Sequence, residues 1–440
     1  MDQGILDRMF KLTQKETDVK TEMLAGLTTF VALAYIIFVN PNILADAGIP
    51  KEAAIASTIW ATALATTLMA VWANFPIAVA PGMGLNAFFA YYVVGVLQLS
   101  WQVALGAVFF SGILFLILTI GGIRQAIIKS VPMNLKCAIG VGIGLFIAFI
   151  GLKNAGIIIA DKATFVTVGH LVNKEPLLAC FGLVFTAVLM ARNVKGSMLI
   201  GIITTTILGM ICGAVPAPKG LNDIISFNIP SMTPTFMQLD LMGAWQFGIF
   251  SIIFTFTIVE LFDNMGTLIG LTRKAKLMND KGDIENLDKA LTTDAVGTLS
   301  SAVFGTSTVT SYIESAAGIA EGGKTGLTAL TVAGLFIVSL LFAPLIGLVP
   351  GFATAPALIL VGALMMAEIV HVSFADFTDG FPAFMTIIMM PLTFSIANGF
   401  AFGFVSYTFV KVLSGRAKEV SLIMWLVSLA FLANFYMRLH

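Results

Sequence analysis

Long apolar stretches follow one another along almost the whole chain. They cover residues 23–44, 52–73, 101–122, 137–151, 177–191, 197–214, 244–271, 326–349 and 380–413. A helix needs roughly 20 apolar residues to cross the hydrocarbon core of a bilayer, and most of these stretches approach or exceed that length. The pattern predicts an all-α polytopic membrane protein with no separate soluble domain.

Two apolar stretches contain residues that interrupt a continuous helix. Residues 75–92, FPIAVAPGMGLNAFFAYY, hold two prolines and two glycines, and residues 300–323, SSAVFGTSTVTSYIESAAGIAEGG, are rich in Ser, Thr and Gly. Each predicts a short extended piece followed by a half-helix. Unpaired backbone at membrane depth must face protein or water, so we expect both stretches to line a transport site. The alternative is a pair of ordinary loops.

Lysine and arginine gather in loops that would lie on one side of the membrane, which predicts a cytoplasmic N-terminus. These residues are Arg8, Lys11, Lys15, Lys20, Arg124, Lys129, Lys136, Arg192, Lys195, Lys324, Lys411, Arg416, Lys418 and the basic loop 273–289. Residues 1–22 do not resemble a cleavable signal, so we expect the first span to remain as an anchor. The polar stretch 215–243 is predicted to be an external linker between two halves.

The composition excludes several classes of partner. The chain is 58% hydrophobic and 11% charged, and its 24 basic residues balance its 24 acidic ones, so we expect lipid and not nucleic acid around it. Its three cysteines lie singly in apolar runs, which argues against disulfides and zinc. We therefore expect no metal and no cofactor.

Four carboxyl groups are candidates for sites inside the membrane: Glu260 and Asp263 in the apolar stretch 244–271, Asp294 in LTTDAVGTLSS and Glu314 in SYIESAAG. Ionisable side chains inside a membrane are rare and usually functional, although hydrogen bonding between helices is the alternative for each. Glu260 and Asp263 are three residues apart on a predicted helix, so we expect them to share a face and meet the same neighbour or the same ligand.

Proton movement is expected to use carboxyl groups. The three histidines, His170, His371 and His440, lie outside the predicted spans. Buried carboxyl groups close to one another can hold a proton between them.

A flat heterocycle fits the polar residues of these stretches. A carboxylate accepts two N–H bonds, and Asn86 offers a further adaptable partner. Phe88 could stack on such a ring, worth roughly 1–3 kcal/mol by analogy with other base-binding sites. The alternative for Phe88 is ordinary core packing.

Four segments carry a family resemblance. MGLNAFFAYY at 83–92, ELFDNMGTLIG at 260–270, ALTTDAVGTLSS at 290–301 and GTSTVTSYIESAAGIAEGGKTGLTAL at 305–330 resemble the AzgA-like purine permeases of the nucleobase:cation symporter-2 family. The resemblance implies a uracil-permease-like fold of fourteen transmembrane segments in two inverted repeats of seven. Segments 3 and 10 would each contain a short β-strand. Residues 419–437 are an extra apolar segment beyond these fourteen, which is expected either to span the membrane or to lie in its interface.

The resemblance also implies a division into a core domain and a gate domain. The core would comprise residues 23–130 (segments 1–4) and 244–349 (segments 8–11). The gate would comprise 131–214 (segments 5–7) and 350–415 (segments 12–14). Residues 1–22 would be a cytoplasmic N-terminus, 215–243 the external linker and 416–440 the C-terminal apolar segment.

Particular residues receive roles by this resemblance. Asp263 and Glu314 would bind the base, flanked by Thr267 and Ser315, with Leu85, Asn86 and Phe88 from the third segment and Thr28 and Thr29 from the first. Asp294 falls on an aspartate that is functionally important in relatives. Thr267 stands where the uracil permease has a histidine linked to protonation, so Glu260 would take part in proton coupling beside Asp263, Asp294 and Glu314.

The sequence therefore predicts a transporter and not an enzyme. We expect it to import a purine, adenine before hypoxanthine or guanine, across the inner membrane of a bacterium, with protons and not sodium, and a homodimer is compatible with the resemblance. One alternative is an anion transporter or channel on the same architecture, which four membrane acids disfavour because acids repel anions. Another is a membrane aspartyl protease using Asp263 and Asp294, but the GxGD sequence of such enzymes is absent.

Overall fold

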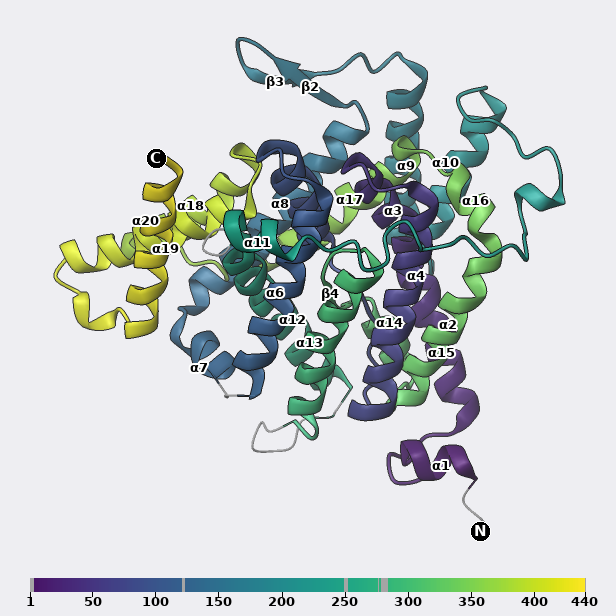
Figure 1. Cartoon of the computed structure of the whole chain (residues 1–440), viewed down its shortest axis with the longest axis horizontal. Helices are drawn as coiled ribbons and strands as arrows, with labels where there is room; N and C mark the ends of the chain where they lie inside the picture. Colours follow the sequence, from purple (N-terminus) through teal and green to yellow (C-terminus); the bar gives the residue numbers. More distant parts are fainter. Residues whose placement is uncertain (1–3, 121–122, 249–251, 276, 278–283, 440) are drawn as a thin grey trace.

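Helices fill almost the whole molecule. The computed structural model describes residues 4–120, 123–248, 252–275, 277 and 284–439 (Figure 1). Within these residues, eight helices are long and apolar enough to cross a membrane: Val19–Asp46, Lys51–Ala73, Trp101–Ile120, Met133–Asn154, Lys174–Ala191, Gly326–Leu348, Gly351–His371 and Ile396–Leu413. Shorter apolar helices cover Met83–Val96, Ser197–Ile211, Phe377–Leu392 and Leu422–Ala433. The predicted all-α polytopic architecture is confirmed.

The two interrupted stretches meet as a pair of short strands. β1 (Val79–Pro81) pairs antiparallel with β4 (Val309–Ser311), and Ala80 lies opposite Thr310. All six strand residues are buried. The prediction that each stretch contains an extended piece is confirmed, and each strand satisfies the backbone of the other along their shared edge.

Each strand leads directly into a short helix. α5 (Met83–Ala87) follows β1 and continues into the π-helical segment η2 (Phe88–Val96), and α14 (Ser315–Ala320) follows β4. The half-helices therefore begin beside the strand pair. α14 approaches the first span so closely that a Cβ on Gly318 would lie 2.1 Å from the Thr29 hydroxyl oxygen.

One group of helices packs around the strand pair. It comprises α2 (Val19–Leu33), α3 (Ile36–Asp46), α4 (Lys51–Leu68), α6 (Trp101–Ile120), α12 (Phe254–Lys274), α13 (Leu287–Phe304) and α15 (Gly326–Ser339). α4 contacts β1, and α12 and α13 contact β4, so both strands are enclosed by helices.

A second group of helices packs mainly among itself. It comprises α8 (Met133–Asn154), α9 (Lys174–Ala191), α10 (Ser197–Ile211), α17 (Gly351–Met365), α18 (Phe377–Leu392) and α19 (Ile396–Leu413). α8 and α17 approach closely at glycine, since a Cβ on Gly362 would lie 2.4 Å from the carbonyl oxygen of Gly144. The division into core and gate remains a prediction that this packing supports.

The remaining elements connect or flank these groups. They are α1 (Ile5–Phe10), η1 (Met69–Ala73), α7 (Ile123–Ser130), β2 (Ile158–Asp161), β3 (Phe165–Val168), η3 (Leu221–Asp223), α11 (Leu241–Gly248), η5 (Leu340–Phe342), α16 (Ala343–Leu348), η6 (Met366–His371), η7 (Ala417–Glu419) and α20 (Leu422–Leu439). The strands β2 and β3 form a projecting hairpin (Figure 1). The apolar stretch 380–413 is divided between α18 and α19.

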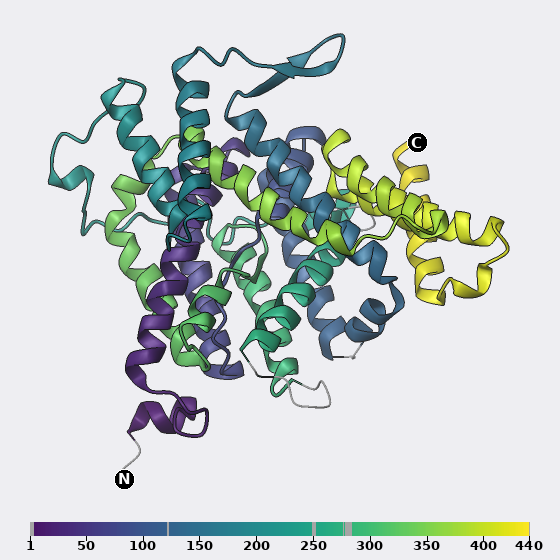
Figure 2. The ribbon, with the colours of Figure 1, turned by 180° about the vertical axis from the view of Figure 1, so that it is seen from behind.

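The C-terminal helix lies at one end of the molecule (Figure 2). α20 packs against α19. The hydroxyl groups of Thr408 and Ser428 lie 2.7 Å apart, and the Phe431 ring centroid lies 5.2 Å from that of Phe254. The predicted extra apolar segment is therefore a packed helix.

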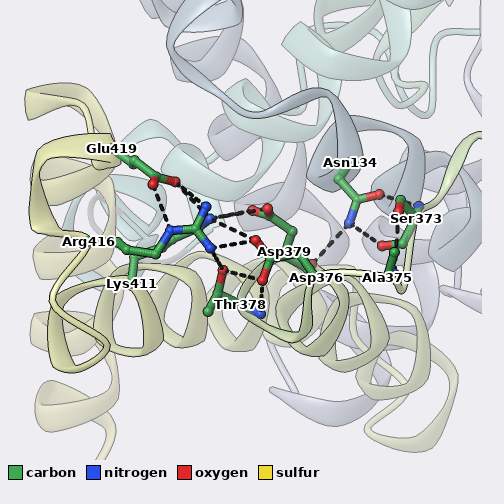
Figure 3. A network of polar contacts seen from close by, with 9 residues as sticks. All are labelled: Asn134, Ser373, Ala375, Asp376, Thr378, Asp379, Lys411, Arg416 and Glu419. Atoms are coloured by element: carbon green, nitrogen blue, oxygen red, sulfur yellow. Dashed lines mark hydrogen bonds and ion pairs between the residues drawn. The ribbon is translucent and has the colours of Figure 1, made fainter.

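A network of charged groups ties α18 to α19 and to the segment that leads into α20 (Figure 3). The buried Lys411 ammonium donates to Asp379 at 3.1 Å and to Glu419 at 2.9 Å, and Arg416 pairs with Asp376 at 2.5 Å. Hydrogen bonds from Arg416 hold the pKa of the Asp376 carboxyl well below its usual range. These bonds link the start of α18 to the end of α19 and to the segment before α20.

Candidate functional site

The structure brings the carboxyl groups of Asp263 and Glu314 together from distant parts of the chain. Asp263 lies on α12 and Glu314 directly before α14, and the two groups interact electrostatically. Both are half-buried, unlike the fully buried acids nearby. Thr310 on β4 is a side-chain hydrogen-bond partner of Asp263. We refer to Asp263 and Glu314 as the carboxyl pair.

Two tyrosines that the sequence analysis missed lie beside the carboxyl pair, and one of them, Tyr35, bonds Glu314. The Tyr35 hydroxyl donates to Oε1 of Glu314 at 2.5 Å and is 1% exposed. Tyr312 interacts electrostatically with both acids, and its hydroxyl donates to the Pro81 carbonyl oxygen at 2.5 Å. The only sequence signal for Tyr35 is its polar hydroxyl within the first apolar stretch.

Several buried polar atoms around the strand pair have no hydrogen-bond partner among the described residues. They include Asn86 Nδ2, Thr308 Oγ1, Ser311 Oγ and Thr29 Oγ1. Asn86 is fixed from its other side, because the Ser307 hydroxyl donates to its Oδ1. Buried polar groups are normally satisfied, so these atoms are candidates to bind a ligand or water.

The other predicted binding residues lie near the carboxyl pair but are engaged within the protein. The Thr267 hydroxyl donates to the Asp263 carbonyl oxygen at 3.1 Å, and Ser315 Oγ accepts the Ala78 N–H at 3.0 Å. Leu85 is 1% exposed and Thr28 is 8% exposed.

Phe88 has its ring covered in this conformation. It is fully buried, stacks on Tyr92 with centroids 5.2 Å apart, and meets Phe256 edge-on at 5.0 Å. Its predicted stacking on a ligand stays a prediction, and it would require these neighbours to move.

Glu260 and Asp263 interact electrostatically with each other and both with Asp294, but their hydrogen-bond partners differ. Glu260 is fully buried and accepts from the Thr298 hydroxyl on α13, whereas Asp263 faces Thr310 on β4. Positions three apart differ by roughly 60° around a helix, and α13 and β4 lie on the two sides of that angle. The two acids therefore lie side by side with different hydrogen-bond partners, and both border Asp294.

A second cluster contains Glu260, Asp294 and Arg124, and we call it the buried charge cluster. Arg124 was expected in a solvated loop, but its side chain is 1% exposed and lies 3.8 Å from the fully buried Asp294. It also interacts electrostatically with Glu260. The positive-inside pattern places an arginine at a membrane edge but carries no signal that the side chain turns inward.

The chain is similar to known permeases over most of its length. A model described as "Permease family" matches residues 20–402. A permease of Methanocaldococcus jannaschii is 48% identical over 98% of both chains. The adenine permease AdeP of Escherichia coli is 43% identical over 98% of this chain and 96% of its own length. The guanine/hypoxanthine permease PbuO of Bacillus subtilis is also 43% identical, over 94% of this chain and 96% of its own.

Solved structures show the same fold at low identity. The transmembrane domain of the cyanobacterial bicarbonate transporter BicA has a TM-score of 0.62, covers 86% of this chain and 97% of its own, and is 15% identical. At this identity the likeness concerns the fold alone. Together with the family match, it confirms the predicted fold class.

Proposed function

The chain belongs to the permease family whose model matches residues 20–402, and we propose that it imports a purine nucleobase together with protons. Its relatives are transport proteins for nucleobases and not enzymes. The adenine and guanine/hypoxanthine permeases match equally well, at 43% identity. We place adenine first because the GMGLNAFF segment with Asn86 resembles the adenine-type permeases.

The carboxyl pair is the observation that carries this proposal. Purine bases present N–H donors along a flat edge, and ionised carboxylates accept such donors strongly. Asp263 and Glu314 are half-buried beside the strand pair, where the unpartnered amide nitrogen of Asn86 can donate to a ring nitrogen. Such a site offers both acceptors and a donor to one base.

Proton coupling is proposed for the neighbouring acids. Glu260 and Asp294 are fully buried, and both interact electrostatically with Asp263 of the carboxyl pair. Movement of the group of helices around the strands against the second group would then carry base and proton together, in an elevator-like motion. The proposed location is a bacterial inner membrane with the N-terminus in the cytoplasm, in keeping with the basic loops.

Anion transport is less well supported. The likeness to the bicarbonate transporter concerns the fold, and the described site presents carboxylates that would repel an anion. No observation on the site favours that alternative.

The proposal is tested with purified protein in liposomes. An imposed inward proton gradient should drive accumulation of labelled adenine, and competition by unlabelled hypoxanthine and guanine should rank the bases. Asp263→Asn and Glu314→Gln should each reduce uptake at low adenine concentration about 100-fold, since a hydrogen bond to a charged group contributes about 1.5–3 kcal/mol.

Glu175→Gln is the matched control, because Glu175 is an exposed acid at the start of α9 and should leave uptake unchanged. Absence of accumulation of all three purines would refute the function. Wild-type uptake by folded Asp263→Asn and Glu314→Gln proteins would remove these residues from the site.

A further inference from the structure

Arg124 supplies a fixed positive charge deep inside the buried charge cluster. Its guanidinium Nη2 lies 3.8 Å from Oδ2 of Asp294, and its Cζ lies 4.0 Å from the centroid of the Phe115 ring. An arginine keeps its charge in proteins. The cluster therefore contains one permanent cation and two groups that can gain or lose a proton.

The charges of the cluster are close but incompletely hydrogen-bonded. Among the described residues, the three guanidinium nitrogens of Arg124 have no hydrogen-bond partner, and neither do Glu260 Oε2 and Asp294 Oδ1. The opposite oxygens are engaged, because Thr298 donates to Glu260 and Asn264 donates to Asp294. One oxygen of each acid is thus held and the other is available.

The cluster is joined to the strand that carries the site. The Asn264 side chain that donates to Asp294 also accepts the Ser311 N–H of β4 at 3.3 Å. Asp263 is the further charged group that faces the cluster, and it interacts electrostatically with both acids and with Glu314. A change of charge in the buried charge cluster therefore changes the electrostatic potential at Asp263 and Glu314.

We propose that Arg124 is a positioning residue for ion coupling: its guanidinium beside Asp294 supplies the positive charge that a metal cation would otherwise bring to Glu260 and Asp294, so that the cluster carries one proton and not sodium. The proton binds the free oxygen of either acid from the water on one side and leaves to the water on the other. This proposal rests on the proton-coupled uptake proposed above.

Charge balance makes the proposal quantitative. With both acids ionised, one positive and two negative groups leave one net negative charge, which a single proton neutralises. Arg124→Gln leaves two negative charges, so one proton no longer yields a neutral cluster. The double substitution Arg124→Gln with Asp294→Asn restores one net negative charge, carried by Glu260. Arg124→Lys preserves the charge of the native cluster.

The test separates coupling from base transport by two assays on the full-length protein in liposomes. Adenine counterflow exchanges base for base and needs no ion gradient. Accumulation driven by an inward proton gradient requires coupling. We expect Arg124→Gln to lower proton-driven accumulation at least roughly 10-fold, because it leaves a buried charge uncompensated, while counterflow persists. The double variant and Arg124→Lys should regain most of the accumulation, and a sodium gradient should not stimulate the wild type.

The outcomes distinguish this inference from the function on which it rests. If the wild type shows no counterflow, the proposed function fails and the inference falls with it. If the wild type shows counterflow without proton-driven accumulation, the coupling fails while base transport stands. With a coupled wild type, normal coupling in Arg124→Gln, or a loss that the double variant does not restore, overturns the role of Arg124. Loss of counterflow in both the double variant and Arg124→Lys would overturn the proposal and show that Arg124 has a structural role. The same conclusion follows if neither variant elutes as folded protein.

Discussion

At the scale of single residues, the candidate site depends on how its carboxylates are fixed. Glu314 is half-buried, and Tyr35 donates to only one of its oxygens. A carboxylate has about four lone-pair positions, so this bond leaves acceptor capacity for a ligand. The same bond restricts the rotation of the Glu314 side chain, so that it is oriented before the base arrives.

Tyr35→Phe is expected to weaken base binding. The substitution removes the hydroxyl that donates to Glu314 at 2.5 Å but keeps the buried ring. A hydrogen bond to a charged group contributes about 1.5–3 kcal/mol, so the Kd for adenine should rise roughly 10- to 100-fold. Isothermal titration of detergent-purified protein measures it. Tyr312→Phe is the comparison, because the Tyr312 hydroxyl donates to the backbone carbonyl oxygen of Pro81. Loss of this bond should lower the Tm of the protein and leave the Kd for adenine nearly unchanged. Equal Kd values for wild type and Tyr35→Phe would contradict this role.

The sequence predicted which acids matter better than it predicted their partners. Glu314 and Asp263 stand out because a carboxylate in an apolar stretch is costly. Tyr35 does not stand out, because a tyrosine in an apolar stretch is common and its hydrogen bond spans 279 residues of sequence. The burial of Arg124 was not predicted for a related reason. Arginines are common at the ends of membrane spans, and only tertiary packing shows that the side chain of this one is buried.

At the scale of elements, the strand pair depends on side chains to complete its backbone hydrogen bonds. β1 has β4 on one edge only. On the other edge, the Thr66 hydroxyl of α4 accepts the Val79 N–H at 3.0 Å and donates to the Val79 carbonyl oxygen at 2.9 Å. One threonine thus replaces the missing neighbouring strand, which membrane depth makes necessary.

Thr66→Val is expected to destabilise the protein. Valine has the shape of threonine but neither accepts nor donates, so the N–H and carbonyl group of Val79 would both be buried without partners. Each unsatisfied group costs about 1–3 kcal/mol, and the loss appears as a lower Tm in a thermal unfolding assay in detergent. Thr66→Ser keeps the hydroxyl and is the matched control. An unchanged Tm in Thr66→Val would mean that β1 does not need this bond.

The sequence predicted that both interrupted stretches contain extended backbone, but it did not predict which elements the side chains of α12 contact. Prolines, glycines and hydroxyl residues in 75–92 and 300–323 exclude a continuous helix, and each stretch does contain a strand in the structure. The different hydrogen-bond partners of Glu260 and Asp263 were not predictable from helical spacing, because they depend on which elements pack against α12. Helical spacing gives the angle between two side chains, but it does not give the elements that each side chain contacts.

At the scale of the whole molecule, a partly buried contact joins the two groups of helices. The Tyr91 hydroxyl, on the segment after α5, donates to Asp46 at 2.8 Å and accepts from Asn154 at the end of α8, also at 2.8 Å. A second link, Lys195 to Glu321 at 2.6 Å, is largely solvent-exposed. Exposed ion pairs contribute about 0–1 kcal/mol, so the Tyr91 contact, in which the tyrosine side chain is buried and makes two hydrogen bonds, is the stronger of these two restraints on relative movement.

Tyr91→Phe is therefore expected to favour separation of the two groups. The ring keeps its edge contact with Phe394, 5.9 Å between centroids, while both hydrogen bonds are lost. Loss of a bond to a charged group shifts the conformational equilibrium about 10- to 100-fold. A cysteine at Ile150, buried one turn before Asn154 on α8, reports this shift through its rate of maleimide labelling, with the three native cysteines replaced by serine.

The labelling rate should rise in Tyr91→Phe and stay unchanged in Tyr407→Phe, whose ring lies on α19 outside this contact. If the core and gate move as bodies, adenine counterflow in Tyr91→Phe should also change, because the restraint acts on the step that reorients the loaded site. Faster labelling with unaltered counterflow would mean that the contact opens locally. Unaltered labelling and counterflow would mean that Tyr91 does not hold the groups together, and that the restraint on their movement lies in the apolar packing of α5 against α8.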